Sequence, residues 1–213
     1  MNTSQQEYYK QRAGEYEKIY SKPERQKDIA ASAAILQQIF SNKNVREIAC
    51  GTGFWTQRIA ATASSIFATD INQTVLDIAQ SKNYSTKVSF AVDDIFSTAY
   101  QTKYETLFGG FIWSHIKLEA LENFIDTVSQ NVFTDGTLIF MDNNFIEASN
   151  TPISRKDSNG DTYQNRLLEN GETYEVVKNF PSENFIRELL GNKTKNVQFT
   201  SLQYFWILQF QLL

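Results

Sequence analysis

The sequence has few of the residues that would tie it to an oxidising compartment or to a membrane. It contains one cysteine in 213 residues, so no disulfide can form within the chain, which is typical of a reducing compartment. No apolar run approaches the roughly 20 residues that cross a bilayer, and the opening MNTSQQEYYK has no apolar signal segment. We therefore expect a cytoplasmic protein with no membrane partner.

Positive charge is also scarce. The chain has 20 Lys and Arg against 24 Asp and Glu, a net charge of −4. Its densest basic stretch, residues 22–27 (KPERQK), includes Glu24 and reads as a solvated helix start. Because a surface that binds a nucleic-acid backbone needs a basic face, we expect no nucleic-acid partner. We also expect no bound metal.

From residue 44 onward, short apolar segments alternate with amphipathic ones. Strands are predicted at 45–50, 65–70, 87–94, 104–113 and 137–143. Helices are predicted between them at 54–63, at 72–82 with Asn72 as the N-cap, and at 117–132. This alternation is typical of an α/β fold in which helices cover both faces of a parallel sheet.

The two ends of the chain follow other patterns. Residues 4–20 and 23–40 predict two helices, which we take as a helical N-terminal cap at 1–43 before a main domain at 44–213. Two Asn-Gly pairs, at 159–160 and 170–171, predict a β-hairpin insert at about 150–180. A helix at 182–191 with Ser182 as N-cap follows, and residues 197–213 are strand-like, as one strand or two.

Polar or small residues end three successive predicted strands. Gly51 and Gly53 follow the first, and they allow the backbone to turn sharply and approach a ligand. Asp70 ends the second, where a carboxylate can accept hydrogen bonds from ribose hydroxyls. Asp93-Asp94-Ile95 follows the third, where a carboxylate can accept the exocyclic amine of an adenine. Ligands of such sheets bind at the carboxyl ends of the strands, so the pattern predicts an adenosine site.

Two better-known nucleotide motifs are missing. A dinucleotide fingerprint needs a third glycine at position 56, which is Thr56. No Gly-Lys-Ser/Thr motif follows the first strand, so the sequence also has no phosphate-binding loop at this position. An adenosine that carries a sulfonium and an amino acid suits this acidic rim.

These motifs together resemble class I S-adenosylmethionine-dependent methyltransferases of the small-molecule type. The resemblance rests on EIACGTG at 47–53, Asp70, Asp94-Ile95, the fourth and fifth strands, and the tyrosine-rich YYKQRAGEYEKIY, and it spans roughly residues 8–213. It implies a Rossmann-like three-layer sandwich with a mostly parallel seven-stranded sheet and an antiparallel C-terminal strand. The cofactor would be S-adenosyl-L-methionine and its product S-adenosyl-L-homocysteine.

The resemblance also implies which residues hold the cofactor. Backbone atoms at 49–53 would hold the methionine part, Asp70 the ribose, and Asp94 with Ile95 the adenine edge. Two positions depart from the family. Ala49 replaces a glycine, and Trp55 replaces a small residue. The Trp55 side chain either fills space near the methionine end or anchors its helix. The expected set is Tyr9, Arg12, Tyr16, Glu47, Ala49, Gly51, Thr52, Gly53, Trp55, Asp70, Ile71, Asp94, Ile95 and Phe111.

The acceptor side is expected beyond the fourth and fifth strands and under the insert. His115, the only histidine, is either a general base or a helix-start residue bonded to backbone. Other expected acceptor residues are Trp113, Asn143, Tyr163 and Arg166. The Asn-Pro-Pro-Tyr motif of many nucleic-acid methyltransferases is absent after the fourth strand, which disfavours a macromolecular acceptor.

Methyl transfer to a small-molecule acceptor by in-line displacement is thus the leading hypothesis. The alternatives are a non-catalytic S-adenosylmethionine-binding protein, an NAD-dependent oxidoreductase, and a protein or RNA methyltransferase. The missing third glycine counts against NAD. We expect a monomer or a homodimer.

Overall fold

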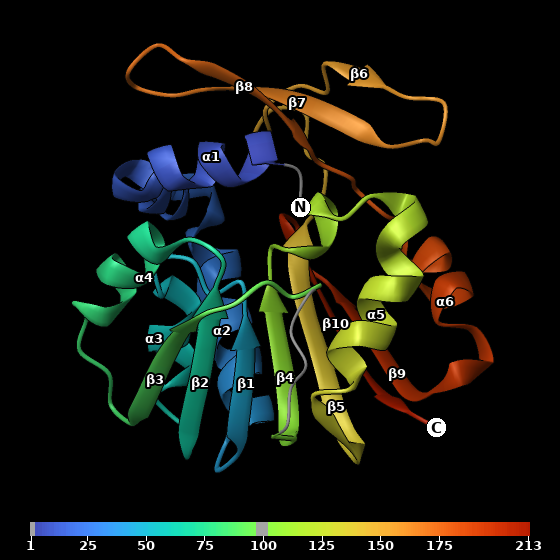
Figure 1. The fold of residues 1–213 in the computed structure, drawn as a ribbon. Coiled ribbons are helices and arrows are strands. Elements are labelled where there is room, and N and C mark those ends of the chain that lie inside the picture. Colours follow the sequence, from blue (N-terminus) through green and yellow to red (C-terminus); the bar gives the residue numbers. More distant parts are fainter. Residues whose placement is uncertain (1–2, 97–101) are drawn as a thin grey trace.

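The computed structural model describes residues 3–96 and 102–213. It is built on one central sheet (Figure 1). The strand order is β3-β2-β1-β4-β5-β10-β9, seven strands in all. All neighbours pair in parallel except β10, which is antiparallel to both β5 and β9. The predicted Rossmann-like fold class is confirmed. The strands are β1 (Asn44–Ile48), β2 (Ser65–Asp70), β3 (Lys87–Val92), β4 (Tyr104–Gly110), β5 (Val132–Asn143), β9 (Thr194–Ser201) and β10 (Phe205–Leu212).

Helices cover both faces of this sheet. On one face lie α2 (Gln26–Phe40), α3 (Phe54–Ile59) and α4 (Gln73–Gln80); on the other lie α5 (Leu121–Ser129) and α6 (Glu183–Leu190). Neighbouring strand residues separate accordingly, with Ile139 and Met141 of β5 in the first core and Leu138 and Phe140 in the second. This period of two is what a strand buried on both faces requires. No helix in the described residues is long and apolar enough to cross a membrane.

The N-terminal segment is less regular than predicted. The single helix expected at 4–20 is instead α1 (Thr3–Gln11) followed by the 3-10 helix η1 (Ala13–Ser21). Gly14 lies just after the break, and glycine is a poor residue for continuing an α-helix. A second short 3-10 helix, η2 (Pro23–Arg25), leads into α2. The change of direction lets this segment follow the upper edge of the sheet (Figure 1).

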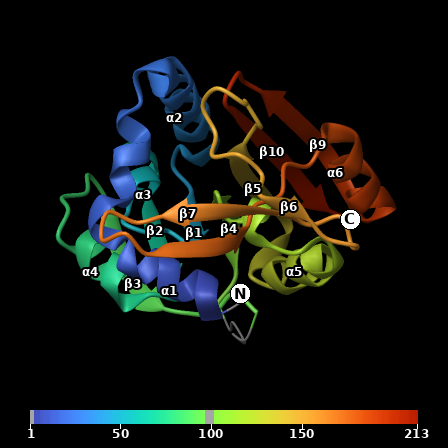
Figure 2. The same cartoon turned by 90° about the horizontal axis from the view of Figure 1, so that it is seen from above.

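The insert forms a small antiparallel sheet of its own. The predicted hairpin is confirmed as β7 (Thr162–Leu167) and β8 (Thr173–Val177), and β6 (Arg155–Lys156) adds a third strand. Gly160 and Gly171 have φ of +91° and +88°, the left-handed conformation that Asn-Gly turns supply. Tyr8 of α1 packs with Leu168 and Val176, so the insert rests on the N-terminal segment. Together they lie across the carboxyl ends of the parallel strands (Figure 2).

Several element boundaries differ from the prediction. The strand expected at 104–113 ends at Gly110, because Phe111 adopts φ +60° and the 3-10 helix η3 (Trp113–His115) follows. The expected strand at 137–143 begins earlier, at Val132, and the C-terminal stretch is two strands. Asn72 occupies the N-cap position of α4, but its side chain donates to the Gln6 carbonyl instead of capping. Ser182 does cap α6, accepting from the Phe185 amide at 3.2 Å. Short 3-10 turns η4 (Leu118–Ala120) and η5 (Gly191–Lys193) complete the described elements.

Candidate active site

A cleft of about 740 Å³ lies at the carboxyl ends of the parallel strands, under the N-terminal segment. Eleven predicted residues line it: Tyr9, Tyr16, Ala49, Gly51, Thr52, Asp70, Ile71, Asp94, Ile95, Phe111 and His115. The sequence reasoning missed Asn72, Gly110 and Ile112, which adjoin predicted residues, and also Val75 on α4. Asp93 was named in the sequence only as the neighbour of Asp94.

The loop after β1 is shaped by left-handed backbone. Ala49, Gly51 and Gly53 have φ of +50°, +56° and +79°. A Cβ on Gly53 would meet the Tyr84 hydroxyl at 2.5 Å, whereas a Cβ on Gly51 would meet nothing within 4 Å. Gly53 is therefore required by packing against the protein, and Gly51 keeps the backbone accessible from the cleft.

Asp70 links this loop to the next strand. Its Oδ2 accepts from the Gly51 amide at 2.9 Å and its Oδ1 from the Asn72 amide at 3.0 Å. Burial raises the pKa of Asp70, and the backbone hydrogen bonds oppose that rise. Each carboxylate oxygen still has acceptor capacity for a ligand in the cleft.

The two aspartates after β3 differ in their contacts. The Asp93 carboxylate forms an ion pair with the fully buried Arg46, whose Nη2 lies 2.8 Å away. Asp94 Oδ1 accepts from the Phe96 amide at 3.0 Å and lines the cleft beside Ile95. Of the pair, Asp93 is the one that anchors the loop to β1.

A smaller hollow of about 300 Å³ adjoins the cleft beneath the glycine loop, and Glu47 and Trp55 line it. Glu47 is 2% exposed, and burial raises its pKa to about 8. Trp55 is also buried and packs against Tyr20 and Phe111. Trp55 therefore both anchors its helix and borders the hollow.

His115 is held through both ring nitrogens. Its Nδ1 lies 2.7 Å from the Val177 carbonyl, which only accepts, so Nδ1 carries the proton. The Tyr9 hydroxyl then donates to Nε2 at 2.6 Å. Burial, reinforced by the nearby Lys178, lowers the pKa of His115 to about 3. The ring is neutral, and it fixes Tyr9 at the wall of the cleft.

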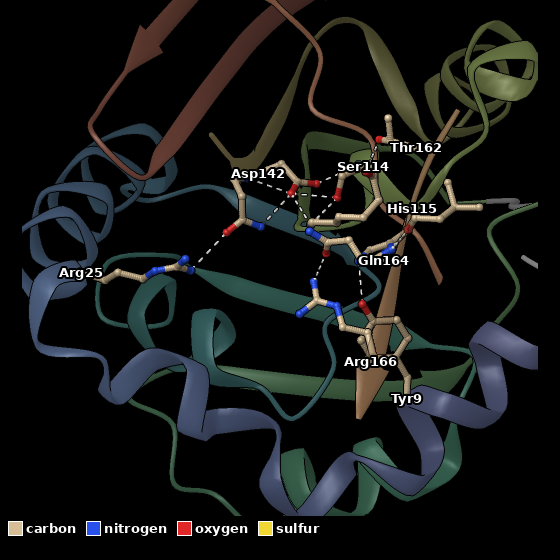
Figure 3. A network of polar contacts seen from close by, with 11 residues as sticks. Tyr9, Arg25, Ser114, His115, Asp142, Thr162, Gln164 and Arg166 are labelled. Atoms are coloured by element: carbon tan, nitrogen blue, oxygen red, sulfur yellow. Dashed lines mark hydrogen bonds and ion pairs between the residues drawn. The ribbon is translucent and has the colours of Figure 1, made fainter. Parts of the chain in front are cut away.

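A buried polar network joins β5 to the end of the insert (Figure 3). Asp142 accepts from the Ser114 amide and hydroxyl, both at 2.9 Å, and from Lys178 Nζ at 3.0 Å. Burial is the largest influence on Asp142 and would raise its pKa, but the Lys178 ammonium together with His115 and the backbone amides of Ser114 and Asn143 lowers that pKa below its usual value. The sequence reasoning missed Lys178, whose one signal is a lysine directly after the strand segment TYEVV.

The structure leaves some predicted residues off the cleft wall. Trp113 is 1% exposed and lies in the core against Phe140 and Trp206, because the turn at Phe111 directs it inward; its predicted acceptor role is corrected to a packing role. Tyr163 donates to Asp157 and stacks under Arg155, within the insert itself.

Three other predicted residues lie near the cleft without lining it. Arg12 donates to the Tyr8 hydroxyl at 2.6 Å and lies over the Tyr16 ring. Asn143 donates to Asp142 at 3.1 Å and accepts from Arg25 at 3.4 Å. Arg166 extends from β7 toward the same region (Figure 3).

Comparison with known proteins agrees with this geometry. Residues 45–136 match the family model described as a methyltransferase domain. No curated protein sequence matches the chain at a significant level.

Solved structures match over nearly the whole chain. A complex of DhpI with SAM and HEP has a TM-score of 0.80 at 24% identity, covering 98% of this chain and 96% of that one. The PH0226 protein from Pyrococcus horikoshii OT3 has a TM-score of 0.74 at 14% identity, covering 93% and 99%. Magnesium protoporphyrin IX methyltransferase from Synechocystis PCC 6803 with bound SAM has a TM-score of 0.58 at 18% identity, covering 88% and 79%. At these identities the likeness is one of fold.

The matched segment contains the glycine loop, Asp70 and Asp94, the residues on which the sequence resemblance rests. The chain therefore contains a segment similar to a methyltransferase domain, and it has the fold of structures solved with SAM or SAH bound.

Proposed function

We propose that this chain transfers the methyl group of S-adenosylmethionine to a small-molecule acceptor. The observation that carries the proposal is the convergence of Gly51, Asp70 and Asp94, from three successive strand ends, on one cleft. The complexes of similar fold with SAM or SAH support the cofactor. The roof formed by α1 and the insert supports an acceptor small enough to be enclosed.

Each part of the cleft suits one part of the cofactor. Asp70 would accept the ribose hydroxyls, and Asp94 the adenine amine beside Ile95. The accessible backbone around Gly51 would contact the methionine chain, and Arg12 would pair with its carboxylate as a charge-assisted fork. Tyr9 and Tyr16 would close the cleft from the N-terminal segment.

The chemistry asks little of the protein beyond alignment. S-adenosylmethionine supplies an activated methyl group on a sulfonium, which leaves in an in-line displacement. The residues of the roof exclude water and fix the approach of the acceptor. A base is needed only for an acceptor that arrives protonated. We assign His115 the role of orienting Tyr9, since its Nε2 already accepts a hydrogen bond.

The cofactor assignment is tested by calorimetry with Asp70→Ala. Loss of a carboxylate that accepts two ribose hydroxyls should weaken S-adenosylmethionine binding by at least about 10-fold. Asp77→Ala is the matched control, because Asp77 lies on the exposed side of α4. Unchanged binding in Asp70→Ala would overturn the site.

Turnover is tested by release of S-adenosylhomocysteine over a panel of metabolites. Release with small acceptors is the expected result. Tight cofactor binding with no release for any acceptor would point to the non-catalytic alternative. Binding of NAD in preference to S-adenosylmethionine would support the oxidoreductase.

A further inference from the structure

Arg25 is a buried cation that forms no ion pair with any carboxylate of the described residues. It is 7% exposed, and its guanidinium donates to the Ser149 hydroxyl and carbonyl at 2.9–3.1 Å and to Asn143 at 3.4 Å. The exposed Glu24 accepts from the same Ser149 hydroxyl at 2.9 Å, and its charge raises the pKa of Arg25 less than burial lowers it. Buried charges in proteins are ordinarily paired, so this arrangement calls for a reason.

Arg166 is half-buried and, like Arg25, is bonded to neutral groups. Its Nη1 donates to the Thr151 hydroxyl at 3.1 Å and its Nη2 to the Gln164 amide oxygen at 2.5 Å. Its Nε is buried and has no hydrogen-bond partner. Here too, none of the described carboxylates forms an ion pair with the guanidinium. Both arginines are bonded only to neutral groups.

These cations are close enough to repel one another. The charge of Arg166 lowers the pKa of Arg25, though less than burial does. The charges of both arginines also lower the pKa of Lys178. The ion pair with Asp142 compensates Lys178 alone. A chain with a net charge of −4 thus concentrates positive charge in one buried place.

The cluster lies beyond the wall of the cleft, toward the β5 side of the sheet, and Arg25, Arg166 and Lys178 are not among the residues that line the cleft. The sheet order places the ends of β1, β2 and β3 on one side of β4 and the end of β5, with Asp142, on the other. Tyr9 and His115 line the cleft, and the Arg166 charge acts on both. Figure 3 shows the guanidinium groups of Arg25 and Arg166 directed toward each other from opposite sides of the network around Asp142.

We propose that the acceptor is a small molecule with an oxyanion group, a carboxylate or a phospho group, that lies between Arg25 and Arg166. The inference rests on the proposed function and names the substrate class of that site. A guanidinium binds such oxyanions through paired, charge-assisted hydrogen bonds. The bound oxyanion would supply a negative charge to the Arg25 and Arg166 guanidinium groups, which form no ion pair among the described residues. The methionine carboxylate of the cofactor is the competing occupant, and the test separates the two.

The first experiment uses four probes of similar size: propionate, ethylphosphonate, 1-propanol and propylamine. Each is titrated by calorimetry into the full chain saturated with S-adenosylhomocysteine. We expect propionate, ethylphosphonate or both to bind, and comparing the two shows which oxyanion is preferred. The alcohol and the amine should not bind. Equal or tighter binding of the alcohol or amine, or no binding of either oxyanion, would overturn the inference.

The second experiment compares Arg166→Gln, Arg166→Lys and the control Arg187→Gln, an exposed arginine on α6. Arg166→Gln should weaken oxyanion binding about 10- to 100-fold and Arg166→Lys less, with cofactor affinity unchanged. Arg187→Gln should change neither. Weakened cofactor binding in both Arg166 variants, with oxyanion affinity retained, would assign the cluster to the methionine carboxylate instead.

The two proposals fail separately. A wild-type chain that binds S-adenosylmethionine but prefers the alcohol or the amine would refute only the oxyanion acceptor. A wild-type chain that does not bind S-adenosylmethionine would refute the proposed function, whatever the probes show.

Discussion

At the scale of single residues, Ala49 is the clearest sign that the loop after β1 is held under strain. Its φ of +50° is in the left-handed region, which costs an L-residue with a Cβ about 1–2 kcal/mol. The loop places its backbone at the wall of the cleft, between β1 and Gly51. Strain of this kind persists where the surrounding structure holds it and where a ligand is approached.

Replacing Ala49 with glycine should therefore stabilise the fold. Glycine adopts positive φ freely but loses more chain entropy on folding, so we expect a net gain of about 0.5–1 kcal/mol in the free energy of unfolding. Urea denaturation measures it. Ala30→Gly, at an exposed position of α2, is the control and should lose about 1 kcal/mol. A loss in both variants would show that Ala49 is not strained.

Glu47 makes stability depend on pH in the opposite sense to an ordinary carboxylate. Its pKa is about 8 in the fold against 4.5 ordinarily, so above pH 4.5 the folded chain holds a proton that the unfolded chain releases. The stabilisation is complete below pH 4.5 and is lost as the pH rises through 8, by up to about 1.4 kcal/mol per pH unit.

Glu47→Gln should remove this dependence, since an amide mimics the protonated acid at every pH. Relative to wild type, the variant should gain stability between pH 5.5 and pH 8, as measured by urea unfolding at both values. Glu122→Gln, at an exposed position of α5, should follow wild type. Parallel wild-type and Glu47→Gln curves would mean that Glu47 is ionised in the fold.

At the scale of elements, the strands and most residues that line the cleft were predictable, because both depend on local patterns. Apolar runs mark β1, β2 and β3, and Asp70 and Asp94 follow two of them directly in the sequence. The polar network around Asp142 was less predictable. Arg25, Asp142 and Lys178 come from segments far apart in the sequence, and the positive φ at Phe111, which directs Trp113 into the core, has no local signal.

The ion pair of Lys178 and Asp142 is what ties the insert to β5. Lys178 is 3% exposed and Asp142 fully buried, so removing one partner leaves the other as an uncompensated buried charge. Lys178→Met should cost about 3–5 kcal/mol. Adding Asp142→Asn should recover a large part of that loss, because the amide oxygen still accepts from Ser114.

A double-mutant cycle in urea checks this coupling. Lys156→Met on β6, which removes an exposed lysine, is the control and should change stability by less than about 0.5 kcal/mol. If the double variant were no more stable than Lys178→Met, the lysine would act by packing and not by charge.

At the scale of the whole molecule, the cleft is lined by two parts of the structure, the N-terminal segment and the central sheet. Tyr9 and Tyr16 come from the N-terminal segment, whereas Gly51, Asp70 and Asp94 come from the sheet. The N-terminal segment also supports the insert through Tyr8, Leu168 and Val176. A molecule held in the cleft would therefore stabilise the roof through contacts made on both sides.

Cofactor binding should thus slow amide hydrogen exchange in two places. We expect protection in the loops at 49–53, 70–72 and 94–95, which touch the ligand, and in the N-terminal segment at 3–21, whose short helices open at low free-energy cost in its absence. Helix α6, on the far side of the second core, should be unaffected and is the internal control. Asp70→Ala at the same S-adenosylmethionine concentration should lose the protection in both regions together. Protection confined to the loops would show that Tyr9 and Tyr16 do not close on the cofactor, and would leave the roof to the acceptor alone.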